Sequence, residues 1–363
     1  MLGVAMHPPS RAERSLRLEE MVYHTSHAAL ADADVERGQL DSITIGACDE
    51  MDGRPISSML MTAPAGGYQT DEIKVTDSGA SALCLAYARF LAGESHLGLV
   101  ASWCKSSKTS VETVMRLRAD PFYTRPLGIG MVVGDALFAQ AVGAEFEVGE
   151  AEVAQRVVNA YTRAKANPRG MRYPVPTIDS VKESGCDAVP LRNAQRAPLT
   201  DGAISIVLAS ETFIDANPDC EPLARIAGVG WATDSYRLDQ RRLRSMNSAR
   251  TAWQAALGQA GLKDANDLDV IELESQTGYH EAAYVRAFDI RIAASISPSG
   301  GPFAQNPLFC SGLINAGEAI LQVANRAGAV QRPSVKRAAA HSCHGCAQQG
   351  NVVMVFETAA GIQ

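Results

Sequence analysis

An internal repeat restricts the fold of this chain more than any other feature of its sequence. His27–Ile43 reads HAALADADVERGQLDSI, and Gln254–Ile271 reads QAALGQAGLKDANDLDVI. Both segments predict a helix, a short acidic turn and a Leu-Asp pair that leads into a strand. Later in each copy a glycine precedes a run of apolar and β-branched residues, in DGAISIVL at 201–208 and QGNVVMVF at 349–356. Such runs are typical of buried strands.

The repeat predicts two halves, residues 1–220 and 221–363. The first half is longer, and its surplus lies at about 105–190, where the pattern is irregular and rich in Arg, Lys, Pro and Gly. Repeats usually differ by insertions on one face, which is often the binding face. Because helices and strands alternate in each half, we expect an α/β fold with mostly parallel sheets covered by helices.

Composition excludes several classes of function. Hydrophobic residues make up 46% of the 363 residues, which is enough for a large core. The net charge of −7 argues against a nucleic-acid partner, which requires a basic face. No apolar run is long enough to span a membrane, and the first residues do not have the pattern of a signal peptide. The eight cysteines are therefore expected to be reduced thiols in the cytoplasm.

Six segments, in the same order, resemble motifs of the thiolase superfamily, and specifically of the sterol-carrier-protein-type thiolases. They are DSGASAL at 77–83, WCKSSKTS at 103–110, 139–173 with its end AKANPRGMRY, APLTDG at 197–202, PSGGPFAQNPLFCSG at 298–312 and HSCHGCAQQGN at 341–351. The resemblance covers nearly the whole chain. It implies the thiolase fold, a duplicated αβαβα five-layer architecture with an insertion (loop) domain in the first half. It also implies that the chain handles acyl-CoA thioesters.

The nucleophile position does not carry the residue that the family needs. Thiolases attack the thioester with a cysteine thiolate, three residues before the glycine that matches Gly79. Thr76 stands there, and threonine has no thiolate chemistry. Cys84 lies in the apolar segment that follows and is interpreted as a packing residue. The resemblance therefore implies a protein that lacks the usual acyl-enzyme step.

Two further catalytic positions also differ from the family. Asn306 aligns with a catalytic histidine; its amide can donate a hydrogen bond to a thioester carbonyl, or it can simply form a turn before Pro307. Glu274, in the segment VIELESQTGYHE, aligns with the second catalytic box. It is either a partly desolvated general base or a carboxylate at a strand end.

The segment 341–351 is the richest in reactive side chains. His344 falls where the sterol-carrier-type enzymes have a histidine, and an imidazole suits acid–base chemistry near neutral pH. Cys343 and Cys346 are the candidates for an atypical nucleophile, and the register of this loop against the family is open. A zinc site needs four ligands, a redox pair needs a thioredoxin-like context, and haem attachment needs a histidine after Cys346; none of these is expected.

The resemblance implies coenzyme A thioester as the substrate, with no permanently bound cofactor and no metal. Basic side chains in the segments that should flank the pantetheine tunnel are candidates for the nucleotide phosphates, or else solvated surface charges: Lys105, Lys108, Lys165, Arg169 and Arg172. Gly300 and Gly301 would let the backbone approach the thioester, or would serve an ordinary turn.

The sequence is compatible with three functions. The first is C–C bond cleavage or formation of the aldol or Claisen type on an acyl-CoA, as in the thiolase-like steroid side-chain aldolases. The second is an acetyl-CoA acetyltransferase or thiolase with an atypical cysteine, and the third is a non-catalytic acyl-CoA-binding subunit. The family also implies a homodimer, paired through the strand at 73–76, and a heteromeric complex with a small zinc-ribbon/OB-fold protein.

Overall fold

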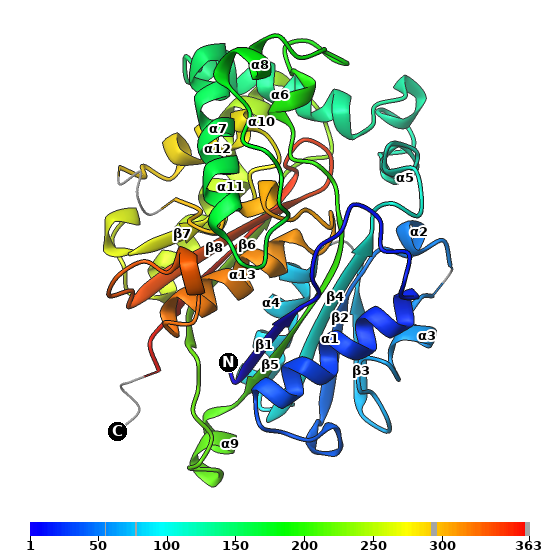
Figure 1. Cartoon of the computed structure of the whole chain (residues 1–363), viewed down its shortest axis with the longest axis vertical. Helices are drawn as coiled ribbons and strands as arrows, with labels where there is room; N and C mark the ends of the chain where they lie inside the picture. The colour runs from blue at the N-terminus through cyan, green and yellow to red at the C-terminus, as the bar shows by residue number, and fades with distance from the viewer. Residues whose placement is uncertain (55, 77, 292–295, 360–363) are drawn as a thin grey trace.

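Two mixed β-sheets lie side by side in the computed structural model, with helices between them and on both outer faces (Figure 1). The structure describes residues 1–54, 56–76, 78–291 and 296–359. One sheet has the order β1-β5-β4-β2-β3, formed by Gly3–Met6, Asp201–Ala209, Leu97–Lys105, Ser42–Gly46 and Asp71–Val75. The other has the order β6-β9-β8-β7, formed by Arg225–Thr233, Gly350–Glu357, Arg337–His344 and Val270–Glu272.

The strand directions correct the expectation of mostly parallel sheets. In the first sheet β2 is parallel to β3 and β4, but β5 is antiparallel to both β4 and β1. In the second sheet only β7 and β8 are parallel, and β9 is antiparallel to β8 and β6. The short turn between His344 and Gly350 explains why β9 is antiparallel to β8, because a tight hairpin joins antiparallel strands.

The repeated segments adopt the predicted order of elements in both halves. In the first, α1 (Leu18–Asp32) and a 3₁₀ turn (Arg37–Gln39) lead into β2. In the second, α11 (Asn247–Gln259) and a 3₁₀ turn (Ala265–Asp267) lead into β7. The two glycine-led runs form β5 and β9, so the strand predictions at 201–208 and 349–356 are confirmed.

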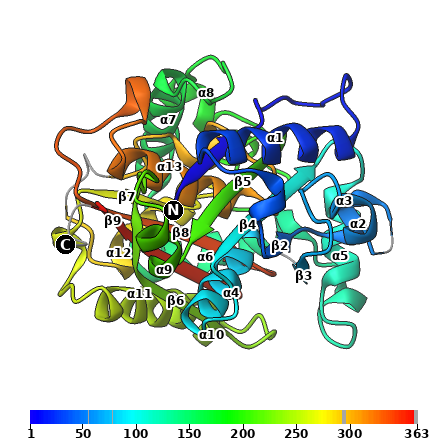
Figure 2. The same ribbon diagram turned by 90° about the horizontal axis from the view of Figure 1, so that it is seen from below.

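Five layers follow from the contacts between these elements. Helix α1 packs on β1 and β5, and α11 packs on β6 and β9, so these helices cover opposite outer faces (Figure 2). Between the sheets, α4 (Gly79–Leu91) packs on β2 and β4, while α13 (Ser311–Val323) packs on β7 and β8. Every residue of α13 is buried, as expected of a helix covered on all sides.

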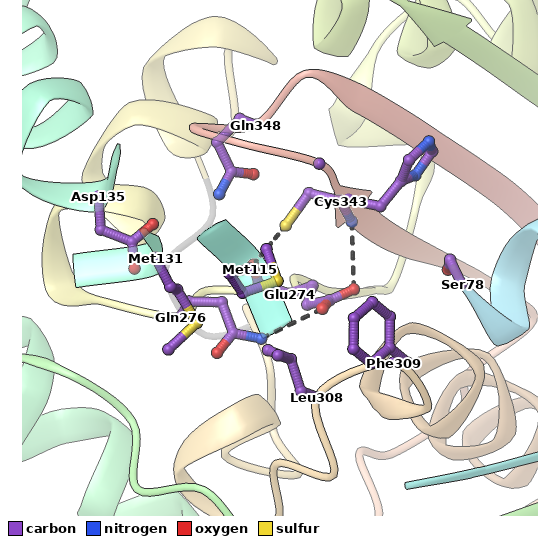
Figure 3. A pocket seen from close by; sticks show the side chains of 12 residues that line it. Ser78, Met115, Met131, Asp135, Glu274, Gln276, Leu308, Phe309, Cys343 and Gln348 are labelled. Carbon is purple, nitrogen blue, oxygen red and sulfur yellow. Dashed lines mark hydrogen bonds between the residues drawn. The ribbon is translucent and has the colours of Figure 1, made fainter. Parts of the chain in front are cut away.

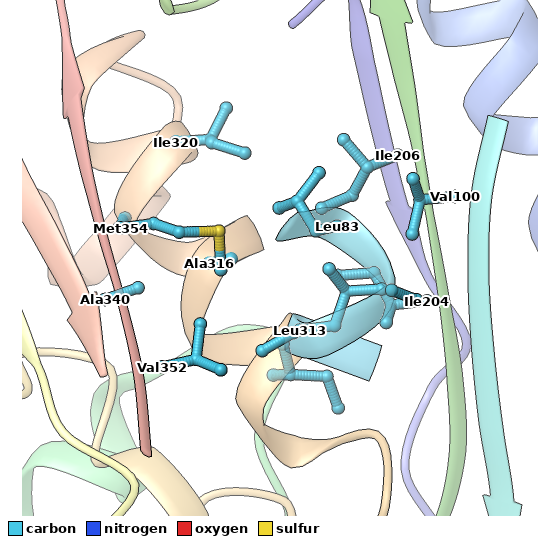
Figure 4. Close-up of a cluster of buried hydrophobic side chains, with 14 of the residues drawn as sticks. Leu83, Val100, Ile204, Ile206, Leu313, Ala316, Ile320, Ala340, Val352 and Met354 are labelled. Atoms are coloured by element: carbon cyan, nitrogen blue, oxygen red, sulfur yellow. The ribbon is translucent and has the colours of Figure 1, made fainter. Parts of the chain in front are cut away.

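The main hydrophobic core fills the space around these two central helices (Figure 4). Leu83 of α4 and Leu313 of α13 meet Ile204 of β5 from one side, and Val352 and Met354 of β9 approach from the other. At roughly 1.5–3 kcal/mol for each fully buried side chain of this size, this core is the main term that holds the two halves together. It also fixes the first turns of α4 and α13 close to the ends of β7 and β8.

The insertion expected at about 105–190 is mainly helical. It contains α5 (Val111–Arg118), α6 (Met131–Glu145), α7 (Glu150–Ala166) and α8 (Ile178–Lys182), and the last three gather at one end of the molecule (Figure 1). Its irregular pattern reflects α6, which buries residues on several faces and therefore lacks a single apolar stripe. Four further α-helices of the described residues are short: α2 (Asp49–Asp52), α3 (Ser58–Met61), α9 (Glu211–Ala216) and α10 (Gln240–Ser245). Helix α12 (Gly278–Ala287) is longer.

Candidate active site

A small cavity lies where the insertion meets the ends of the central elements (Figure 3). It has a volume of about 50 Å³, several times the space that one water molecule needs. Its walls come from the start of α4, from α5 and α6, from the chain after β7, from the turn before α13 and from the β8–β9 hairpin. They are formed by Ser78, Met115, Met131, Asp135, Glu274, Gln276, Leu308, Phe309, Cys343, His344, Gly345 and Gln348.

Glu274 is buried at the centre of this site and accepts four hydrogen bonds. Oε1 accepts from Ser311 Oγ at 2.6 Å and from the Gln276 amide at 3.1 Å. Oε2 accepts from Ser342 Oγ at 2.7 Å and from the Cys343 backbone N–H at 3.1 Å. Burial raises the pKa of the Glu274 carboxyl, and these donors oppose that effect by stabilising the ionised form. Glu274 thus ties the start of α13 to the end of β8.

Asn306 reaches the cavity only through Gln276. The Asn306 amide donates to Gln276 Oε1 at 2.7 Å, and the Gln276 amide donates back to Asn306 Oδ1 at 3.1 Å. Asn306 is completely buried and is not part of the cavity wall, whereas Gln276 is. Sequence analysis missed Gln276, although it lies only two residues after Glu274.

Ser78, and not Thr76, faces the cavity from the nucleophile loop. Thr76 is exposed and lies outside the cavity wall. Ser78 is the N-cap of α4, where its Oγ accepts from the Ala80 N–H, and the same Oγ lies 3.1 Å from Ser342 Oγ. A serine directly before Gly79 and an apolar helix is a capping signal, so the sequence did contain a clue to this position.

Cys343 and His344 both line the cavity, at the end of β8. Burial raises the pKa of the Cys343 thiol well above its usual range, and the nearby Glu274 raises it further. Burial, and next the positive charge of Arg118, lower the pKa of His344, so its imidazole is neutral near pH 7 and can accept a proton. Among the described residues, none provides a hydrogen-bond partner for His344 Nδ1.

Cys346 lies in the hairpin turn and is outside the cavity wall. Burial raises the pKa of its thiol to about 11, so it is protonated at neutral pH. Its side chain packs beside the second hydrophobic cluster and against α6, close to Gly134. The structure therefore brings together Glu274, Cys343 and His344, with Asn306 behind them, and leaves Thr76 and Cys346 outside.

A second pair of polar side chains lines the cavity from α6 and the β8–β9 hairpin, and sequence analysis missed both. Asp135 of α6 lines the cavity, and burial raises the pKa of its carboxyl to about 7. Gln348 lines the cavity beside it, accepts a short hydrogen bond from the Tyr284 hydroxyl and lies 2.7 Å from His280 Nε2. No motif marks Asp135, which stands alone in the apolar segment MVVGDALFAQ.

The predicted phosphate-binding side chains already have protein partners, or are exposed. Lys105 donates to the Leu16 carbonyl and Lys108 to the Asp52 carbonyl, at 2.8 and 2.9 Å. Arg169 forms a bidentate ion pair with the buried Glu318. Arg172 is exposed and donates to the Lys165 carbonyl at 2.7 Å. The Lys165 side chain is also exposed. Their role toward a nucleotide stays a prediction.

Gly300 and Gly301 form a turn that packs against the insertion. Gly300 has φ +88°, and a Cβ there would lie 2.6 Å from the backbone of Ala164 in α7. Gly301 has φ +54°, and neither glycine lines the cavity. The turn and the close approach of α7 explain both residues, since other residues rarely adopt positive φ. Contact with a thioester stays a prediction for both.

The described residues form neither a metal site nor a membrane-spanning helix. No group of three or more His, Cys, Asp and Glu side chains there is arranged to hold a metal ion. Among the described helices, none is both long and apolar enough to cross a membrane.

Comparison with solved structures reveals the same architecture over nearly the whole chain. Human mitochondrial 3-ketoacyl-CoA thiolase has a TM-score of 0.81 at 15% identity, covering 99% of this chain and 98% of its own. The chain has the thiolase fold. Acetyl-CoA acetyltransferase from Syntrophomonas wolfei gives 0.78 at 15% identity, with 98% of both chains covered. The Ltp2-ChsH2(DUF35) aldolase gives 0.80 at 14% identity, covering 100% of this chain and 98% of its own.

These structures confirm the α/β thiolase fold class that the six motifs predicted. At the level of sequence, no family model matches the chain, and neither does any curated protein. Identities of 14–15% establish the thiolase fold and leave the reaction to be argued from the cavity itself.

Proposed function

We propose that this thiolase-fold protein acts on acyl-CoA thioesters and cleaves or forms a C–C bond by acid–base chemistry, of the aldol or Claisen type, without an acyl-enzyme. One observation carries the proposal. The cavity contains a neutral imidazole, His344, and two carboxyl groups, while the residue at the nucleophile position, Thr76, lies outside it. Such groups can move protons, which is sufficient for aldol-type chemistry.

Similar structures support the choice of substrate. The human 3-ketoacyl-CoA thiolase has been solved in complex with CoA, at the same TM-score of 0.81. One neighbour is an aldolase, which fits C–C cleavage on this fold. The apolar side chains Met115, Met131, Leu308 and Phe309 line the cavity and suit an acyl chain. In this proposal His344 is the acid–base group on one side of the thioester, and Glu274 and Asn306 hold the surrounding loops.

A second candidate, a thiolase with an atypical nucleophile, is favoured by the position of Cys343 in the cavity wall. The raised pKa of that thiol argues against it, because the thiolate is the nucleophile. A third candidate is an acyl-CoA-binding subunit without its own activity. We also propose a homodimer and a heteromeric complex with a small zinc-ribbon/OB-fold protein; the aldolase neighbour carries two components in its name.

Turnover of a 3-hydroxyacyl-CoA, with release of a carbonyl compound and a shorter acyl-CoA, tests the proposal directly. His344→Ala should reduce kcat by roughly 10²–10⁴-fold, the usual contribution of a general acid or base, and leave acyl-CoA affinity nearly unchanged. Thr76→Ala should cost far less. A stable mass increase of the intact protein after incubation with acyl-CoA would favour the covalent alternative instead.

The subunit hypothesis requires its own comparison. The chain should bind acyl-CoA whether or not it is active, so binding alone cannot separate the two hypotheses. Turnover by the isolated chain would support the hypothesis that it is an enzyme. Turnover that appears only after a co-purifying small protein is added would support the same hypothesis. Binding without turnover in both cases would support the non-catalytic subunit.

A further inference from the structure

The two carboxyl groups of the cavity differ in what they can still bind. Both oxygens of Glu274 are occupied, by Ser311 and Gln276 at Oε1 and by Ser342 and the Cys343 backbone at Oε2. Four hydrogen bonds use the four lone-pair positions of a carboxylate, so Glu274 has no free position for a substrate. A fixed carboxylate of this kind orients its neighbours and does not exchange protons easily.

Asp135 differs from Glu274 because its carboxylate lacks such donors in the described part of the chain. It is 7% exposed, it faces the cavity from α6, and among the hydrogen bonds of the described residues none reaches its carboxylate. His280 Nε2 lies 3.9 Å from Asp135 Oδ1, beyond hydrogen-bond distance. A buried carboxylate without a donor is costly, and such groups persist where a ligand supplies the missing hydrogen bond. In Figure 3 Asp135 lies across the cavity from Ser78 and Phe309.

His280 cannot neutralise Asp135, because its ring is neutral and both ring nitrogens are occupied. Nδ1 lies 2.9 Å from Thr277 Oγ1, and Nε2 lies 2.7 Å from the Gln348 amide nitrogen. If the amide donates to Nε2, the ring proton is on Nδ1 and points away from Asp135. Burial lowers the pKa of His280 to about 3, so it stays neutral at physiological pH.

We propose that Asp135 is the catalytic carboxylate of this cavity, that it binds the hydroxyl of a 3-hydroxyacyl thioester with an uncharged acyl chain, and that Glu274 is a positioning residue. This rests on the proposed function and assigns the residue that binds the substrate hydroxyl. A hydroxyl can donate a hydrogen bond to a free carboxylate without bringing charge into the site. No lysine or arginine lines the described cavity wall, so an acyl chain with a second carboxylate would be left without a counter-ion.

The chemical step balances without any other reactant. The Asp135 carboxylate removes the proton from the hydroxyl on C3, and the C3–O bond becomes a carbonyl. The C2–C3 bond breaks, and its electron pair forms the enolate of the shorter thioester. The proton held by Asp135 then moves to C2 by way of the neutral imidazole of His344, which lines the same cavity. This yields a ketone or aldehyde and a shorter acyl-CoA and restores the carboxylate. The reverse sequence is an aldol addition.

The charged groups around Asp135 set the pH at which it becomes a base. Burial is the largest effect and raises its pKa to about 7; Arg196 lowers the pKa and Glu112 of α5 raises it. His280 of α12 is neutral, and the thiols of Cys343 and Cys346 in the hairpin are protonated. The general base must be ionised, so kcat/KM should rise with pH through a midpoint of about 7 and level off above it. Glu112→Gln should move that rise to lower pH, because it removes a negative neighbour.

The test compares wild type with Asp135→Asn on a 3-hydroxyacyl-CoA and on the matching 3-deoxyacyl-CoA. We expect kcat to fall by roughly 10²–10⁴-fold, and the pH-dependent rise near 7 to disappear. Wild type should bind the hydroxylated compound more tightly than the deoxy compound, and Asp135→Ala should remove the difference. Affinity for the deoxy compound, measured by calorimetry, serves as the folding control for both variants.

Different results would overturn the assignment of Asp135 and the proposed function. If wild type turns over the hydroxyacyl-CoA and Asp135→Asn does so within tenfold of it, the assignment of Asp135 is overturned while the proposed function stands. An unchanged pH profile in Glu112→Gln would also count against Asp135 as the base. If wild type gives no turnover, the proposed function fails; the hydroxyl preference in binding, and its loss in Asp135→Ala, then still decides whether Asp135 holds a hydroxyl.

Discussion

Gln276 and Asn306 exchange two amide hydrogen bonds, of 2.7 and 3.1 Å, between the chain after β7 and the turn before α13. One partner lines the cavity and the other is completely buried behind it. The second N–H of the Gln276 amide is also occupied, by Glu274 at 3.1 Å. Asn306 therefore fixes the orientation of a cavity residue and does not itself line the cavity.

Removing Asn306 should disturb the cavity without removing a reacting group. In Asn306→Ala the Gln276 amide loses two hydrogen bonds and can rotate, which displaces one wall of the cavity. We expect kcat to decrease by roughly 10–10²-fold, the effect of a small misplacement of positioning groups. The neighbouring buried amide Gln305 does not line the cavity, so Gln305→Ala is the matched control. Equal activity of the two variants would show that Gln276 does not need Asn306.

The thiols should react in the order of their exposure and not of their distance from the cavity. Cys186 is exposed, whereas Cys84 and Cys343 have thiol pKa values that burial raises well above the usual range. Because iodoacetamide reacts with thiolates, Cys186 should be labelled first and Cys343 no faster than Cys84. Peptide mass spectrometry over a time course measures this order. Fast labelling of Cys343, with protection by acyl-CoA, would revive the covalent mechanism.

Glu272 should make folding stability depend on pH. Its carboxyl is buried in β7, where Ser299 donates to it, and burial together with nearby Glu318 raises its pKa to about 8. The folded state then holds this proton more tightly than the unfolded chain, whose pKa is about 4.3. The contribution to stability is therefore complete at low pH and is lost as pH rises through about 4.3 to 8.

Glu272→Gln mimics the protonated carboxyl and should remove this dependence. Relative to wild type, the variant should gain stability as the pH rises from 5 to 8, on the order of 3–4 kcal/mol. Urea unfolding at several pH values measures the difference, with exposed Glu221→Gln as the control. Parallel pH profiles of wild type and Glu272→Gln would mean that Glu272 is ionised in the folded protein at every pH tested.

The free edge of the first sheet is the expected site of dimerisation. β3 pairs with β2 and ends the sheet. Asp71 N–H bonds to Asp41 and the Val75 carbonyl accepts from Ala47, both on the β2 side. Because successive residues of a strand point their backbone groups to opposite sides, Glu72 presents its N–H to the open edge. Proline there removes a donor that a second β3 strand would need.

Light scattering should therefore find a dimer for wild type and a shift toward monomer for Glu72→Pro. Glu72→Lys changes the side chain more strongly but keeps the backbone N–H, so it should remain dimeric. A monomeric wild type at all concentrations would contradict the proposal, and so would an unchanged dimer in Glu72→Pro.

The sequence by itself determined the duplication and the positions of the strands that build each half. β5 and β9 each appear as a glycine followed by apolar residues, and a strand buried on both faces leaves that signal regardless of its neighbours. The sequence also indicated two of the segments that approach the cavity. Glu274 was selected from one of these segments and Cys343 and His344 from the other, and all three side chains line the cavity. The direction of β5 and β9 relative to their neighbours left no comparable signal, because antiparallel and parallel strands can share one apolar pattern.

The tertiary structure alone decided what the polar groups can do. Sequence analysis marked Glu274 by its motif and did not mark Asp135, and nothing in the sequence shows which of the two carboxylates keeps a free position for a ligand. Four donors from three separate segments converge on Glu274, whereas none of the described residues donates a hydrogen bond to Asp135. The acid–base behaviour of a carboxyl depends on burial and on donors that arrive from distant parts of the chain. These donors come close to the carboxyl only when α6, α13 and β8 have packed around the same cavity.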